Sequence, residues 1–182
     1  MTGRGRTRVV LGLLVVLLAL TSTLIIGGLL TGFGRISTIP VASCAPGRSS
    51  GQTVQVSLTD GGGMMGPALM MLGLHTDPQS VAAGPVTFLA TNHGRLDHEL
   101  VVLPMSADGL GTRPVGADGK IEESASLGVA SRSCASGVGD GIAPGSRSWV
   151  TIDLRSGTYE LVCDEPWHYA NGMDAAFTVI RS

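Results

Sequence analysis

Short stretches that alternate apolar and polar side chains, separated by glycine and proline, are the feature that most constrains the fold. Thr53–Thr59 and Trp149–Leu154 alternate with a period of two residues, which is typical of strands with one buried face. Four more runs have strand character: Val86–Ala90, His98–Leu103, Tyr159–Val162 and Ala176–Ile180. At least six short strands with Gly- and Pro-rich connections predict an all-β, Greek-key β-sandwich.

Three details complete the predicted strand map. Gly61–Thr76 does not fit the strand pattern, because it is rich in glycine and methionine. Met105–Arg147 is a long polar excursion in which we expect one short helix near Ile121–Leu127. Ser156 and Gly157 predict a hairpin turn between two of the strands.

An apolar leader precedes the β-patterned part. Val9–Leu30 contains 22 residues without a charge, and such a helix is about 33 Å long, enough to cross a bilayer core of ~30 Å. Three arginines precede this run, which predicts a cytoplasmic N-terminus and places the rest of the chain outside. We expect an uncleaved transmembrane anchor; the alternatives are a cleaved signal peptide and a lipoprotein cleavage box at Val41–Cys44.

These patterns divide the chain into three predicted parts. They are a basic segment with its anchor at 1–35, a linker at 36–52 and a β domain at 53–182. Every acidic residue follows Cys44, so the chain from Cys44 onward has a net charge of -6. The net charge of -2 for the whole chain excludes the strongly basic surface of a nucleic-acid-binding protein.

The residues that carry chemistry lie mostly in Cys163–Met173. Cys163, His168 and Met173 are each separated by four residues, so one loop between two strands holds three soft or borderline metal ligands. Upstream, the segment ending in His98 joins two strands and places this histidine at a strand start. Two histidines, one cysteine and a weak methionine form the ligand set of blue-copper electron-transfer sites.

On these residues, the segment from about Thr53 to Ile180 resembles the cupredoxin family of small blue copper proteins, and the loop spacing resembles its rusticyanin and sulfocyanin branch. The resemblance implies one type 1 copper ion that alternates between Cu(I) and Cu(II). It also implies three strong ligands and a weak axial methionine, which are His98, Cys163, His168 and Met173. The chain departs from many members at one position, because the residue after the first histidine is Glu99 rather than asparagine.

The resemblance further implies how the electron leaves. In the family the C-terminal histidine usually reaches the surface through an apolar patch, a role that falls on His168 with Pro166, Trp167 and Tyr169 at the rim. We therefore predict a membrane-tethered, extracytoplasmic one-electron carrier that is not an enzyme. Its partners would be redox proteins, with basic docking surfaces that match the acidic domain.

The remaining histidines and methionines leave alternatives open. His93 is the competing candidate for the first ligand position, although we expect it on a surface loop. With only His75 left beside it, a copper enzyme that needs further His-rich centres is excluded. Thioethers favour Cu(I), so the methionine-rich segment suggests a second, exchangeable site and an alternative function in copper binding and delivery. Its members are Met64, Met65, Met70 and Met71, which could equally pack over the sandwich end.

Cys44 and Cys134 remain once Cys163 is assigned to the metal. They are even in number, lie outside the predicted strands and belong to an oxidising compartment, so a disulfide is the simplest pairing. In the chain-entropy model a loop of ~90 residues contributes about 4–5 kcal/mol of stability. Lipidation of Cys44 and two free thiols are the alternatives.

Overall fold

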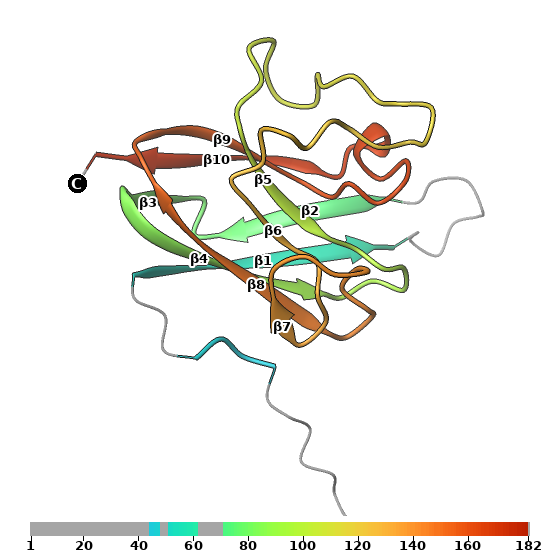
Figure 1. The fold of residues 1–182 in the computed structure, drawn as a ribbon, viewed down its shortest axis with the longest axis horizontal. Coiled ribbons are helices and arrows are strands. Elements are labelled where there is room, and N and C mark those ends of the chain that lie inside the picture. The colour runs from blue at the N-terminus through green and yellow to red at the C-terminus, as the bar shows by residue number, and fades with distance from the viewer. Residues whose placement is uncertain (1–43, 48–50, 62–70, 182) are drawn as a thin grey trace, which may run out of the picture. The chain divides into compact units, whose positions relative to one another are not determined.

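The strands of the β domain form two sheets (Figure 1). The computed structural model describes residues 44–47, 51–61 and 71–181. The first sheet contains, in spatial order, β2 (Leu72–Asp77), β1 (Gln52–Asp60), β4 (Gly84–Asn92), β8 (Arg147–Leu154) and β7 (Ala135–Ser136). The second contains β3 (Ser80–Ala82), β10 (Asp174–Ile180), β9 (Gly157–Val162), β5 (Leu100–Pro104) and β6 (Gly128–Ala130). The predicted all-β, two-sheet sandwich is confirmed.

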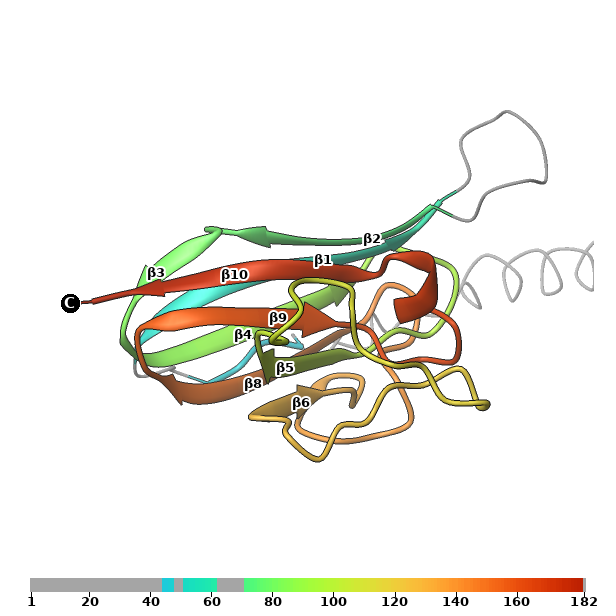
Figure 2. The ribbon, with the colours of Figure 1, turned by 90° about the horizontal axis from the view of Figure 1, so that it is seen from above.

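Most neighbouring strands are antiparallel, but three pairs are parallel. These are β1 with β4, β3 with β10, and β7 with β8. Figure 2 shows the order β10, β9, β5 and β6 across the second sheet. The β1–β4 pair matters most for the site, because its register places Leu58 beside Asn92. The end of β1 therefore lies next to the loop that follows β4.

Several predicted features fall on residues outside the described ranges. They include the anchor at 1–35 and the methionines Met64, Met65 and Met70. Across residues 44–47, 51–61 and 71–181, no helix has the length and apolar character needed to span a bilayer.

The predicted helix near Ile121–Leu127 is wrong. Ile121 instead forms an antiparallel bridge with Val115, and the residues after it turn without entering a helix. Ile121 is buried against the second sheet while Glu122 is exposed. The segment thus packs through one buried residue, Ile121, rather than through a helical face.

The predicted hairpin at Ser156 and Gly157 is also wrong. This turn joins β8 to β9, and these two strands belong to different sheets. The local turn signal is real, but the chain uses it to cross from one sheet to the other. Gly61–Thr76 also differs from expectation, because its C-terminal part belongs to β2.

Two hydrophobic clusters lie on opposite faces of the second sheet. The larger fills the space between the sheets, where Phe88 and Phe177 meet edge to face with ring centroids 5.1 Å apart. Leu161 belongs to that cluster, whereas its neighbour Val162 belongs to the smaller one, as alternation along a strand requires. The smaller cluster is covered by Ile121 from the excursion between β5 and β6, which is yellow in Figure 1.

A disulfide joins Cys44 to Cys134, as the simplest pairing predicted. The two cysteines are 90 positions apart in sequence, and Cys134 directly precedes β7. The bond therefore links the segment before β1 to the edge of the first sheet. Cys163 is the free cysteine and is buried.

Candidate metal centre

His98 lies between β4 and β5, in a loop that Asn92 organises. The Asn92 side chain is buried and donates hydrogen bonds to the carbonyls of Leu96 and Ile142 at 2.7 and 2.6 Å. His98 pairs with Ile142 through two backbone hydrogen bonds of 3.3 and 2.6 Å. These bonds fix the backbone of a residue whose side chain has no solvent exposure.

Cys163, His168 and Met173 lie on the loop that joins β9 to β10. The Cys163 N–H donates to the Met173 carbonyl at 3.0 Å, and the Met173 N–H donates to the His168 carbonyl at 3.1 Å. Between them, the short 3-10 helix η1 (Tyr169–Asn171) ends at Gly172, whose φ of 83° is readily adopted by glycine. The loop is thus closed by its own backbone.

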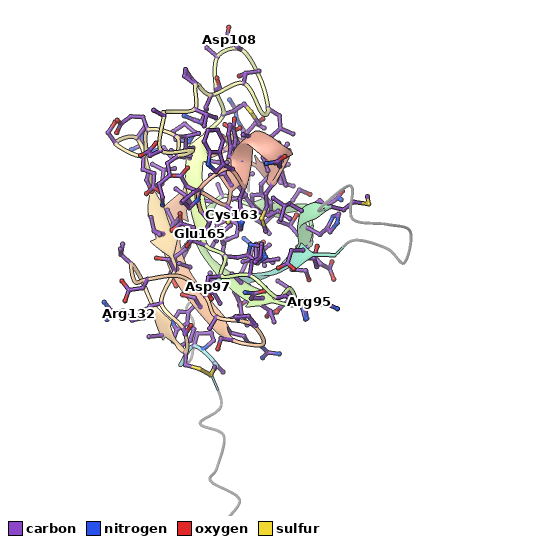
Figure 3. All side chains as sticks on the ribbon, turned by 90° about the vertical axis from the view of Figure 1, so that its right-hand side faces the viewer. Arg95, Asp97, Asp108, Arg132, Cys163 and Glu165 are labelled. Carbon is purple, nitrogen blue, oxygen red and sulfur yellow. A yellow bond between two sulfur atoms is a disulfide. The ribbon has the colours of Figure 1, made fainter. Side chains whose placement is uncertain are left out.

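Three donor atoms converge at this end of the sandwich, which Figure 3 views with Cys163 labelled. The Cys163 Sγ lies 3.3 Å from the Nδ1 of His168 and 3.8 Å from the Nδ1 of His98. The two Nδ1 atoms are 3.2 Å apart. With zinc-type bonds of about 2.0–2.1 Å to nitrogen and about 2.3 Å to sulfur, three donors spread evenly around one ion would lie roughly 3.5–3.8 Å apart. The separation of the Cys163 Sγ from His98 falls in this range and the other two lie slightly below it, so the three donors are close enough to share one ion after small outward shifts.

Asp60, the last residue of β1, orients His98. Its Oδ2 lies 3.0 Å from the Nε2 of His98 and also accepts the backbone N–H groups of Arg95 and Leu96 at 2.7 and 2.8 Å. Burial acts to raise the pKa of Asp60, but these hydrogen bonds outweigh it and hold the pKa below its usual value. An ionised carboxylate accepts the Nε2 hydrogen, which leaves the Nδ1 lone pair free for a metal.

Burial favours the neutral form of every donor. It lowers the pKa of His98 against the opposing effect of Asp60, and it lowers the pKa of His168, with the neighbouring His98 acting in the same direction. Burial also raises the pKa of the Cys163 thiol to about 12, although the N–H of Glu99 donates to the sulfur at 3.3 Å. Both imidazoles are ready to bind, while a metal must displace the thiol proton.

Met173 is fully buried and belongs to the same core cluster as Cys163. The donor cluster together with Met173 is consistent with a type 1 copper site, because this combination of two imidazoles, a thiolate and a thioether suits both copper oxidation states. His93 and His75 are exposed and do not join the cluster of His98, Cys163 and His168.

The predicted rim of the site is correct for two residues and wrong for the third. Trp167 is 54% exposed and Pro166 is also exposed, beside the half-buried His168. Tyr169 is instead buried, and its hydroxyl donates to the carboxylate of Glu160 at 2.8 Å. Glu160 has no solvent exposure, and its carboxylate pairs with the guanidinium of Arg113 at 2.7 Å. Tyr169 therefore anchors the loop to the excursion rather than lining the surface.

Two groups of residues near the site were not predicted from the sequence. Asp60 is one, and its only signal was its place at the end of a strand. The other is a cluster of Glu99, Glu123 and Asp164, whose carboxylate oxygens lie within 4.8 Å of one another. Glu99 and Asp164 directly follow two predicted ligands, but nothing in the sequence brings Glu123 to them.

Comparisons with solved structures find a distant likeness. The chain is similar to auracyanin from the photosynthetic bacterium Roseiflexus castenholzii at 17% identity, covering 72% of this chain and 99% of that chain, with a TM-score of 0.43. It is similar to auracyanin B at 20% identity, covering 74% and 93%, with a TM-score of 0.47. Rusticyanin from Thiobacillus ferrooxidans is 18% identical over 72% and 79%, with a TM-score of 0.44. No family model and no curated protein matches the chain.

Proposed function

We propose that the protein is a type 1 blue copper protein that carries one electron between redox partner proteins outside the cytoplasm. The observation that carries this proposal is the convergence of the Cys163 Sγ with the Nδ1 atoms of His98 and His168, at separations of 3.2–3.8 Å. Met173 is the proposed weak axial ligand. A bound copper ion supplies reversible exchange of a single electron.

The residues around the donors suit such a carrier, because they keep the ligands in place in both oxidation states. Backbone hydrogen bonds close the loop at Cys163 and Met173, and Asp60 fixes the ring of His98. Ligands that are held in advance move little when the charge of the bound ion changes, so little rearrangement slows electron transfer.

The two histidines differ in access to solvent. His98 is fully buried, whereas His168 is half-buried next to the exposed Pro166 and Trp167. We infer that the electron enters and leaves at the His168 side. The surrounding surface includes Asp97 and Glu165, both labelled in Figure 3, and these acidic groups favour a partner with a basic docking surface.

The disulfide between Cys44 and Cys134 supports an oxidising, extracytoplasmic location. A tether formed by Val9–Leu30 remains part of the proposal, because three arginines followed by 22 uncharged residues favour an anchor with the domain outside.

The visible spectrum of the copper-loaded, full-length chain tests the proposal. We expect intense thiolate-to-copper absorption that disappears on chemical reduction and returns on oxidation by one electron. Cys163→Ala should abolish the absorption, because it removes the thiolate. His93→Ala is the matched control, since this exposed histidine precedes the site and should leave the colour unchanged. A colourless protein that holds zinc equally well would contradict the proposal.

A further inference from the structure

Three carboxylates meet on the outer face of the second sheet. Glu99 and Asp164 are 8% and 1% exposed, and Glu123 is half-buried. One carboxylate oxygen from each lies within 4.8 Å of the other two. Glu123 comes from the excursion between β5 and β6, and the excursion is also held to Asp164 by a 2.7 Å hydrogen bond from the N–H of Ile121.

This cluster is separate from the donors of the proposed copper site. Side chains alternate along extended chain, so Glu99 and Asp164 point away from the side that His98 and Cys163 occupy. The same alternation assigns Val162 to the smaller hydrophobic cluster on the outer face. The carboxylates thus lie beside that cluster, beneath the excursion.

Glu99 has a buried oxygen that the protein leaves unsatisfied. Its Oε1 is inaccessible to solvent and has no hydrogen-bond partner. The Lys120 Nζ lies 3.8 Å away, which is too far for a hydrogen bond, and the lysine side chain is 38% exposed. A buried carboxylate oxygen that accepts no hydrogen bond is costly, and a 3.8 Å ion pair with a partly exposed lysine offsets only part of that cost, which points to a further ligand.

We propose that Glu99, Glu123 and Asp164 bind one hard divalent cation of the Ca²⁺ or Mn²⁺ type. Oxygen-only ligand sets favour such ions over copper. Calcium–oxygen bonds are about 2.3–2.6 Å long, so two oxygens on opposite sides of one ion lie about 4.6–5.2 Å apart. One oxygen from each of the three carboxylates lies within 4.8 Å of the others, so no pair is farther apart than two oxygens bound to one calcium ion can be.

The site goes beyond electron transfer and does not depend on the proposed function. A cation bound at this site also modifies electron transfer, because Glu99 and Asp164 directly follow His98 and Cys163 in the chain. A cation bound on the outer face changes the charge next to the donors on the inner face.

Calorimetric titration of the full-length, copper-free chain with CaCl₂, and separately with MnCl₂, tests the site. We expect saturable binding of one ion, with a dissociation constant no weaker than about 10⁻³ M. Glu123→Gln should weaken binding at least tenfold, because it removes one ligand charge. Glu122→Gln is the matched control, since this exposed neighbour accepts the N–H of Ser124, does not belong to the cluster and should keep the affinity within twofold.

A third variant keeps the test decisive if Glu123→Gln folds poorly. Lys120→Gln removes the nearby positive charge and should tighten binding severalfold. Absence of saturable binding to the wild-type chain would overturn the proposal and leave the carboxylates neutralised by protons and Lys120. Equal affinity in Glu123→Gln, or weaker binding in Lys120→Gln, would overturn it as well. None of these outcomes depends on copper, whose colour is measured separately.

Discussion

The inner and outer faces of the β5–β9 pair carry opposite chemistry, although adjacent residues build them. On the inner face, His98 and Cys163 present soft donors that surrounding backbone and Asp60 hold in place. On the outer face, Glu99 and Asp164 present hard oxygens, one of which accepts no hydrogen bond. A shift of one position along extended chain therefore separates a preorganised set of donors from three carboxylates that have Lys120 as a nearby counter-charge.

Burial favours the neutral form of the ionisable groups on both faces. This helps the imidazoles to bind a metal and hinders the carboxylates. Burial lowers the pKa of His98 and His168 and leaves the imidazoles in their binding form. On the outer face burial raises the pKa of Glu99 and of Glu123 to about 7, with Glu123 also affected by its hydrogen bond to Asp164. Cations at the outer face must therefore compete with protons.

The largest expected effect is a difference in copper affinity between substitutions at two neighbouring residues, one on each face. His98→Ala should lower copper affinity more than about a hundredfold, the upper end of losses for residues that only support a ligand. Glu99→Gln should keep one copper per chain and change the affinity by less than about tenfold, below the losses for residues that support a ligand, because its side chain points to the outer face, away from the donors. Competition titration against a Cu(I) chelator measures both. If the two variants lose copper equally, the faces are not independent.

A smaller effect is expected for the residue that orients His98. Asp60→Asn keeps the size of the side chain but removes its charge, and we expect copper affinity to fall about 10–100-fold. The same chelator competition checks this prediction. Asp97→Asn is the control, because Asp97 is exposed and has no hydrogen bond to the ring. An affinity within twofold of wild type for Asp60→Asn would mean that His98 is held without it.

The smallest effect concerns stability and pH on the outer face. Glu123 has its pKa raised from 4.5 to about 7, so the unfolded state releases this proton first and the free energy of unfolding falls as the pH rises between those values. Glu123→Gln should match wild type below about pH 4.5 and become relatively more stable up to about pH 7. Urea unfolding of copper-free protein in chelator measures the difference. A difference that does not change with pH would contradict the assignment.

The strands that were predicted from the sequence are long enough to show a pattern of apolar residues. β1, β8 and β10 alternate between more and less buried residues, whereas β4 and β9 are mostly runs of buried residues, and the apolar residues of the sequence follow both patterns. The strands β3, β6 and β7 have two or three residues each, too few for a period to emerge. Nearby residues also do not reveal whether two strands joined by a turn pair with each other. The Ser156–Gly157 turn joins two strands that belong to different sheets.

The same distinction applies to the site. Cys163, His168 and Met173 share one short loop, so their spacing was sufficient to propose them together. Asp60 was missed because it reaches His98, 38 residues away, only through the parallel register of β1 and β4. Glu123 was missed because the expected helix gave no reason to bring this part of the excursion to Asp164.

The disulfide between Cys44 and Cys134 determines how a pulling force on the N-terminal side passes into the domain. Tension applied to the chain before Cys44 passes through the two sulfur atoms to the start of β7, at the edge of the first sheet. The 90-residue interval between these cysteines includes β1 to β6 and is bypassed. Asp60 and His98 both lie inside that shielded interval, so pulling on the N-terminal side would not stretch the contact between them.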